Sequence, residues 1–194
     1  MKAKIAIIGK GHFGSALNEG LKRAGYETRV TGKGPAVRDT AAWGEVIILA
    51  VPFGALDAVV AETGGALDGK TIVDVTNVMG SGGEMALGFT TSGAEQLQKK
   101  VPSAKVVKAF NTVFAQNAST GKVKGKTVSC FVAGNDPAAK AQVLEMAGAI
   151  GFDPVDAGPL TNARWLEAMG YLNIQLGYVV NKGLGASIGL TLVK

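Results

Sequence analysis

Three glycines near the beginning of the chain have the spacing that brings backbone N–H groups to a phosphate. Gly9, Gly11 and Gly14 follow the apolar, strand-like residues 2–8, and an amphipathic helical pattern begins with them. Gly9 permits a tight turn, Gly11 lets the backbone approach a pyrophosphate, and Gly14 lets the helix pack closely on the sheet. The other residues of this turn are Lys10, His12 and Phe13. Because a helix N-terminus adds unpaired N–H groups, the sequence predicts a dinucleotide site here.

The end of the second predicted strand indicates which dinucleotide binds. A site for NAD usually places Asp or Glu there, where the carboxylate binds the ribose 2′-hydroxyl. This chain has Thr31, Gly32 and Lys33 at that point, and Glu27 lies too early, within the strand itself. A cation beside a hydroxyl suits a 2′-phosphate, so we predict NADP(H). The alternative is that Lys33 is only a solvated turn residue.

The ends of three further strands carry side chains that could position the cofactor. In a doubly wound sheet, ligands bind at the carboxyl ends of the parallel strands. The predicted cofactor contacts at these ends are Ala50, Val51, Pro52 and Phe53, then Thr76 and Asn77, and finally Asn111. Residues 50–53 could equally be ordinary core before a helix, and the sequence does not separate these interpretations.

The only histidine, His12, is the one candidate for proton transfer. It could donate to the cofactor, protonate a reduced acceptor, or occupy its loop position only because of its size. Direct hydride transfer between two rings needs alignment rather than a nucleophile, so we assign no catalytic residue. One histidine and one cysteine cannot assemble an ordinary zinc site, and we predict no metal.

The elements that must position these residues alternate between strand and helix. This alternation predicts an α/β, Rossmann-type, doubly wound and mainly parallel sheet. After the first unit, strands are expected over residues 26–31, 46–51, 70–76, 105–110, 127–133 and 153–156. Helices are expected over residues 36–42, over 53–62, and from Asp136 and Pro137 to a point before Gly151.

Two segments interrupt the alternation. Residues 78–93 are rich in glycine, serine and threonine, and form either a mobile flap or a surface connection with one short helix around residues 84–87. Residues 162–182 show a helical seam formed by Trp165, Met169, Leu172, Leu176 and Val179. Leu166, Ile174 and Tyr178 make this helix apolar on other faces too. It is therefore buried within one chain or against a second subunit, and we favour a homodimer.

We expect residues 1–158 to form the NADP(H)-binding Rossmann domain. We expect residues 159–194 to form a small helical segment with the acceptor site and a dimer contact.

The 194 residues carry a net charge of +5, but the lysines and arginines are scattered without interleaved aromatic residues, which argues against nucleic-acid binding. No apolar run is long enough to span a membrane and no signal peptide is evident, so we expect a cytoplasmic chain with no membrane contact. The single cysteine, Cys130, is expected to be buried and inert.

Six segments together resemble one reductase family. They are residues 8–14, 31–33, 50–53, 74–77, 107–112 and 156–167. The chain resembles the NADPH-dependent coenzyme F-420 reductases, the deazaflavin-linked NADP oxidoreductases, and is also similar to the NADPH-binding domain of six-transmembrane ferric reductases. The resemblance implies that the first half binds NADP(H), and that the C-terminal part closes over a small-molecule redox acceptor such as coenzyme F-420 or a flavin. The alternatives are an imine or keto-acid reductase, a ferric reductase, or a protein that senses NADP(H) without turnover.

Overall fold

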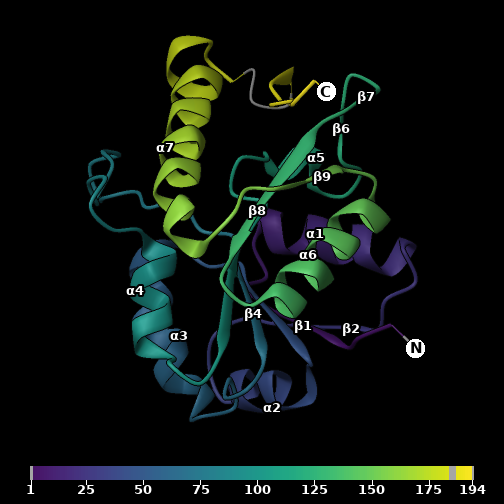
Figure 1. Cartoon of the computed structure of the whole chain (residues 1–194), viewed down its shortest axis with the longest axis vertical. Coiled ribbons are helices and arrows are strands. Elements are labelled where there is room, and N and C mark those ends of the chain that lie inside the picture. The colour runs from purple at the N-terminus through teal and green to yellow at the C-terminus, as the bar shows by residue number, and fades with distance from the viewer. Residues whose placement is uncertain (1, 184–186, 194) are drawn as a thin grey trace.

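The chain forms a seven-stranded sheet enclosed by helices on both faces (Figure 1). The computed structural model describes residues 2–183 and 187–193. The sheet contains β1 (Ile5–Ile8), β2 (Thr28–Thr31), β3 (Val46–Leu49), β4 (Thr71–Asp74), β5 (Lys105–Lys108), β8 (Ser129–Gly134) and β9 (Asp153–Asp156), in the order β2-β1-β3-β4-β5-β8-β9. The predicted Rossmann-type class is therefore confirmed.

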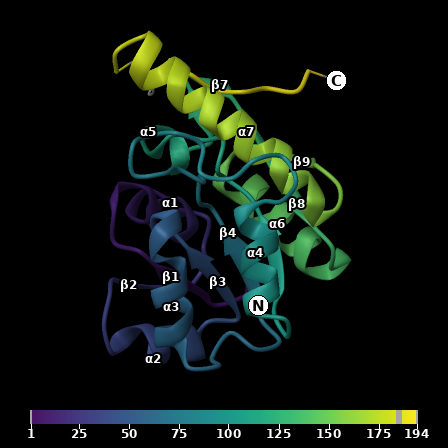
Figure 2. The ribbon, with the colours of Figure 1, turned by 90° about the vertical axis from the view of Figure 1, so that its left-hand side faces the viewer.

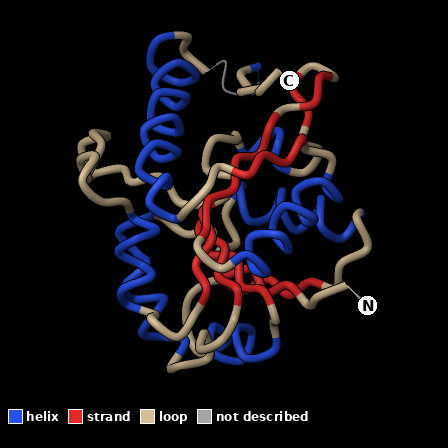
Figure 3. Tube along the Cα trace, in the orientation of Figure 1, coloured by secondary structure: helices blue, strands red, loops and turns tan. Residues whose placement is uncertain are grey.

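The helices form two layers, which bury the central strands completely. One layer contains α1 (His12–Arg23), α5 (Ala115–Ala118) and α6 (Pro137–Ile150), and the other contains α2 (Ala36–Trp43), α3 (Leu56–Thr63) and α4 (Gly93–Lys100). Figure 3 shows the strands running between these groups of helices. Every residue of β1, β3 and β4 is buried, as expected for parallel strands covered on both faces.

The parallel pairing brings the functional strand ends to one edge. Strands β1 to β5 pair in parallel, so their carboxyl ends lie together. Strand β8 runs antiparallel to β5, whereas β9 pairs in parallel with β8. The connection from β5 to β8 contains only the short α5 and the hairpin of β6 (Lys122–Val123) and β7 (Lys126–Thr127), without a long crossover helix. The sheet is thus mainly, not wholly, parallel.

Residues 78–93, between β4 and α4, do not contain the short helix that one of the two predictions placed there. The short helix expected at residues 84–87 is absent, because Met79 and Met85 form an antiparallel bridge that closes a turn there. The following helix, α4, was not predicted. Its sequence signal is a capping box, in which the Ser92 hydroxyl accepts the Glu95 N–H at 3.1 Å.

The C-terminal segment forms the predicted long helix. A 3₁₀ turn (Leu160–Asn162) leads into α7 (Ala163–Ile174), which continues as a π-helix over Gln175–Val180. Figure 2 shows α7 crossing the upper part of the molecule, with its far end projecting from the body. The expected segment 159–194 includes residues 184–186 and 194, which lie outside the described residues. Within the described residues, no helix has the length and apolar character needed to span a membrane.

Candidate functional site

The glycine turn between β1 and α1 has the geometry that its spacing predicted. Gly9 has a φ of +130°, and a Cβ atom there would lie 2.0 Å from the Ala50 carbonyl oxygen. A Cβ atom at Gly14 would lie 2.1 Å from the Gly9 oxygen. Apart from its two chain neighbours, no atom of the described residues lies within 4 Å of the Cβ position at Gly11, and no described side chain caps the start of α1. Gly9 and Gly14 therefore allow close packing, while Gly11 leaves the helix N-terminus open to a ligand.

A cleft of about 310 Å³ begins at this turn and follows the carboxyl ends of the strands. Its lining residues are Gly11, His12, Phe13, Ala50, Val51, Pro52, Val75, Thr76, Asn77, Asn111 and Val113. Most of the predicted cofactor contacts therefore meet around one cavity. Exposed His12 also lines an adjacent hollow with Lys10 and Ser15, along the first turn of α1.

Phe53 lies away from this cleft, unlike the other predicted residues of its segment. Pro52 is followed by a 3₁₀ turn (Phe53–Ala55), which directs the aromatic ring toward α4. The ring lies 3.0 Å from the Cβ position at Gly93 and lines a different hollow. Its role as a cofactor contact stays a prediction that the geometry does not favour.

The predicted 2′-phosphate region lies at the end of β2. Thr31 is buried, and its carbonyl accepts the Gly9 N–H at 2.8 Å, which ties this strand end to the glycine turn. Lys33 is exposed and makes no ion pair with any described residue. Glu62 of α3 accepts the Gly34 N–H at 3.0 Å, a contact that the sequence did not indicate. The turn is therefore anchored while the Lys33 ammonium remains free to meet an anion.

Two asparagines at the far end of the cleft hold one another in a fixed orientation. The Asn77 Nδ2 group donates to the Asn111 carbonyl at 2.9 Å, and Asn111 Nδ2 donates to Asn77 Oδ1 at 3.1 Å and to the Leu166 carbonyl at 2.7 Å. Because a backbone carbonyl can only accept, the Asn111 amide cannot be reversed. Its Oδ1 is buried and has no partner among the described residues, like the Thr76 hydroxyl. Both oxygens therefore have unused hydrogen-bonding capacity in the described structure.

The backbone is strained at the residue before Asn111. Phe110 has a φ of +62°, although it is a bulky residue and buried. Such a conformation is unfavourable for a side chain with a Cβ atom and persists only where packing imposes it. The Phe110 ring packs edge-on against Phe152, with ring centroids 5.7 Å apart.

A second cavity, of about 190 Å³, lies beside the first and beneath α7. The two cavities share Phe13, Asn77, Asn111 and Val113, and the second is completed by residues of the β5 to α5 connection and of α7. Gly170 allows the close approach of α7, because a Cβ atom there would lie 2.3 Å from Asn77 Oδ1. The C-terminal helix therefore forms one wall of the second cavity, beside the first.

Three charged residues beneath the cleft were not among the predicted site residues. Asp74, Lys108 and Glu167 are buried, and the Lys108 ammonium pairs with both carboxylates. The sequence did contain a signal, since Asp74 and Lys108 end two apolar strands and a buried charge needs a partner.

The remaining sequence predictions concern metals and the cysteine. Within the described ranges, no group of three or more potential ligands could hold a metal ion. Cys130 is buried, as predicted, and burial raises the pKa of its thiol to about 12. The thiol is therefore protonated and unreactive at neutral pH.

The fold and the cleft define a Rossmann-type dinucleotide-binding protein, and comparisons with known proteins identify its family. The F420-dependent NADP reductase of Methanocaldococcus jannaschii is 30% identical over 182 residues, which cover 88% of this chain and 78% of that protein. A solved structure that carries the same family name, from Arthrobacter sp. FB24, superposes with a TM-score of 0.89 at 28% identity, covering 99% of this chain and all of the other. The chain belongs to the F420-dependent NADP reductase family.

A second group of relatives has a different name. The metalloreductase STEAP3 of Rattus norvegicus is 31% identical over 180 residues, 86% of this chain. The chain spans only about a third of the length of the metalloreductases that it matches, 36% in this case. No family model matches the chain.

Proposed function

We propose that the chain is an NADP(H)-dependent oxidoreductase that transfers a hydride between NADPH and a ring-type acceptor, either coenzyme F-420 or a flavin. The oxidoreductase class and the NADP(H) cofactor follow from membership of the reductase family. The observation that carries the proposal is the pair of adjacent cavities, one at the glycine turn and one beneath α7. Adjacent sites for two ring systems are what direct hydride transfer requires.

The cofactor would lie across the carboxyl ends of the strands. The open N-terminus of α1 at Gly11 would hold the pyrophosphate, with Lys33 and the Thr31 hydroxyl near the 2′-phosphate. Phe13 lines the cleft, and the Lys10 side chain lies 3.7 Å from the Cβ position at Gly32, just after β2.

The buried polar atoms at the far end of the cleft fit a nicotinamide carboxamide. Asn111 Oδ1 is a fixed acceptor without a partner among the described residues, and a carboxamide has N–H groups to donate. The Thr76 hydroxyl can donate or accept beside it. Ala50 and Val51 add apolar walls that exclude water. Bound NADPH supplies the hydride, so the protein needs only to bind and orient the two rings.

The cavity beneath α7 is the proposed place for the acceptor, within the segment 159–194. Aromatic and apolar walls suit a flat ring, and Phe114 and Tyr178 meet edge-on there with centroids 5.2 Å apart. Asn173 contributes a polar atom, because its Nδ2 donates to the Thr112 carbonyl at 2.9 Å and its Oδ1 has no partner in the described structure. An acceptor with a ring N–H group would match that oxygen.

The test follows NADPH absorbance with purified protein and a panel of deazaflavin, flavin, ferric chelate and imine acceptors. We expect oxidation with coenzyme F-420 or a flavin, and its loss in Gly11→Asp, which places a carboxylate where the pyrophosphate would bind. Gly54→Asp is the matched control, since its Cβ position is equally open but lies outside the cleft. Oxidation by ferric chelate alone would favour a ferric reductase, and saturable binding without turnover would favour a sensor.

We also propose that the chain forms a homodimer through the outer face of α7 and its π-helical extension. Trp165, Leu172, Leu176 and Val179 are exposed by 55%, 58%, 37% and 60% along this continuous face. Exposed apolar surface of this kind usually marks an interface. Sedimentation should show a dimer that Leu172→Glu dissociates and that Ala149→Glu, on exposed α6 surface, leaves intact. A monomer at all concentrations would contradict the proposal.

A cytoplasmic location is part of the same proposal. The chain has one cysteine, which is buried and free, so it has no intrachain disulfide that would require an oxidising compartment. Fractionation of cells that express the protein would test this location.

A further inference from the structure

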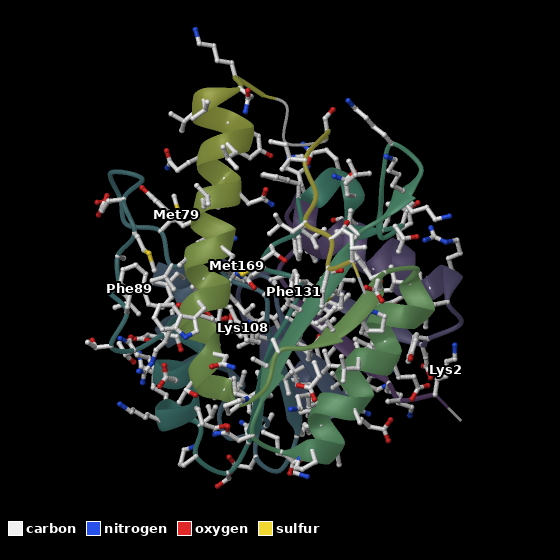
Figure 4. The ribbon with its side chains drawn as sticks, turned by 45° about the horizontal axis from the view of Figure 1, so that its top comes forward. Lys2, Met79, Phe89, Lys108, Phe131 and Met169 are labelled. Carbon is white, nitrogen blue, oxygen red and sulfur yellow. The ribbon has the colours of Figure 1, made fainter. Side chains whose placement is uncertain are left out.

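Lys108, which is labelled in Figure 4, forms a buried charge cluster with Asp74 and Glu167. The Lys108 ammonium lies 3.0 Å from Asp74 Oδ2 and 2.9 Å from Glu167 Oε1, and the side chains are essentially inaccessible to solvent. The three residues come from β4, β5 and α7, so the cluster joins the sheet to the C-terminal helix. Buried charges are tolerated only when they are paired and hydrogen-bonded, as these are.

The cluster also holds the backbone of the cofactor cleft. The Lys108 ammonium donates to the Thr76 carbonyl at 2.6 Å, and Asp74 Oδ1 accepts the Thr76 N–H at 2.9 Å. Both backbone polar groups of Thr76 are therefore fixed by charged side chains. Thr76 and its neighbour Asn77 line the cleft, where the Thr76 hydroxyl has no partner among the described residues.

Glu167 extends the same cluster to the segment that follows the cleft. Its Oε2 accepts the Gly93 N–H at 3.0 Å and its Oε1 accepts the Ala94 N–H at 3.3 Å, at the start of α4. Residues 78–92 run between Asn77 and this helix, so the cluster binds the backbone two residues before this segment, at Thr76, and directly after it, at Gly93. The position of α7 is thereby linked to the shape of the cleft.

Lys108 is a cation in this environment. Burial by itself would lower the pKa of Lys108, but the carboxylates of Asp74 and Glu167 overcome that effect and raise the pKa above its ordinary value. The charge that holds Thr76 is therefore present throughout the physiological pH range.

We propose that Lys108 is a positioning residue for the cofactor: with Asp74 and Glu167 it holds the Thr76–Asn77 turn in the conformation that receives the nicotinamide end of NADP(H). The proposal rests on the function proposed above. It follows that cofactor binding depends on the docking of α7 through Glu167, although Glu167 itself lines neither cavity. A cluster with a purely structural role would affect unfolding and leave the affinity for NADPH unchanged in the folded protein.

The test measures the dissociation constant of NADPH by fluorescence titration, and KM and kcat in steady state, at a temperature where each variant is folded. Lys108→Met keeps the length of the side chain and removes the ammonium. We expect the dissociation constant and KM for NADPH to rise about tenfold or more, with a smaller change in kcat. Glu167→Gln, which retains one oxygen for the N–H groups of α4, should weaken binding severalfold.

Met146→Ala is the matched control, because Met146 is fully buried in the helix layer of α6 and touches neither cavity. It should lower the melting temperature and leave the affinity for NADPH within about twofold. If Lys108→Met folds and its affinity for NADPH is unchanged, the proposal is overturned. If Lys108→Met does not fold, an unchanged affinity in Glu167→Gln overturns the proposal. Failure of the wild-type protein to bind NADPH would instead refute the proposed function.

Discussion

The substitution Gly170→Ala tests whether α7 must approach the asparagine pair as closely as the structure shows. A methyl group there would lie 2.3 Å from Asn77 Oδ1 and 2.7 Å from Asn111 Nδ2, well inside normal contact distance. In an open helical position, alanine would stabilise the fold by about 0.5–1 kcal/mol relative to glycine. Overpacking costs about 1–3 kcal/mol, and each hydrogen bond lost from the pair costs about 0.5–1.5 kcal/mol. With one hydrogen bond lost, we therefore expect a net loss of about 0.5–4 kcal/mol in the free energy of unfolding.

The assay is denaturant unfolding followed by circular dichroism, with Gly148→Ala as the control. Gly148 is also helical and exposed, and among the described residues outside its own helix a methyl group there would meet Pro154 Cγ alone, at 3.7 Å. That substitution should stabilise the protein by about 0.5–1 kcal/mol. The Gly170 variant should also bind NADPH more weakly, because the displaced amides line the cleft. Equal stabilisation by both substitutions, with unchanged NADPH binding, would refute the proposed packing of α7 over the cleft.

Three further predictions concern single side chains. Lys33→Glu should raise the dissociation constant of NADPH by about 10–100-fold, which corresponds to the free energy of a hydrogen bond to a charged group, and should change that of NADH little. An equal loss of affinity for both cofactors would contradict the assignment of Lys33 to the 2′-phosphate. The hydrogen bond from Arg164 lowers the pKa of the Glu95 carboxyl group. This hydrogen bond therefore stabilises the fold fully at pH values above the ordinary pKa of a glutamate, and the stabilisation is lost as the pH falls through the lowered pKa. The difference in melting temperature between wild type and Glu95→Gln should therefore be largest near neutral pH and vanish in acid, and a constant difference would disprove this account. Cys130 should react with a thiol reagent only as fast as the protein unfolds, since burial raises the pKa of its thiol to about 12; rapid labelling under native conditions would contradict its burial.

The geometry of the glycine turn after β1 could be predicted from sequence because its contacts are local. Gly9 and Gly14 are required by contacts with backbone only a few residues away or on the adjacent strand, and these contacts are present. The strand ends at Ala50, Thr76 and Asn111 could be placed at one edge because parallel strands end together.

Other features depend on contacts that sequence spacing does not specify. The direction of the Phe53 ring is set by a single 3₁₀ turn and by the position of Gly93 on α4. Lys108 in an apolar strand indicates a buried partner, and Asp74 on the adjacent strand is a natural candidate. Glu167 lies 59 residues further along the chain and reaches Lys108 only because α7 returns to the sheet edge.

The most direct test of hydride transfer in this cleft uses NADPH deuterated at the transferred position of C4, with oxidised coenzyme F-420 as the acceptor. The deazaflavin accepts hydride at a carbon atom, where the label does not exchange with water. We predict that deuterium appears in the reduced coenzyme in proportion to the NADPH consumed, and that Gly11→Asp abolishes this transfer. Consumption of NADPH without deuterium in the reduced coenzyme, or no consumption at all, would contradict the proposed hydride transfer to a deazaflavin.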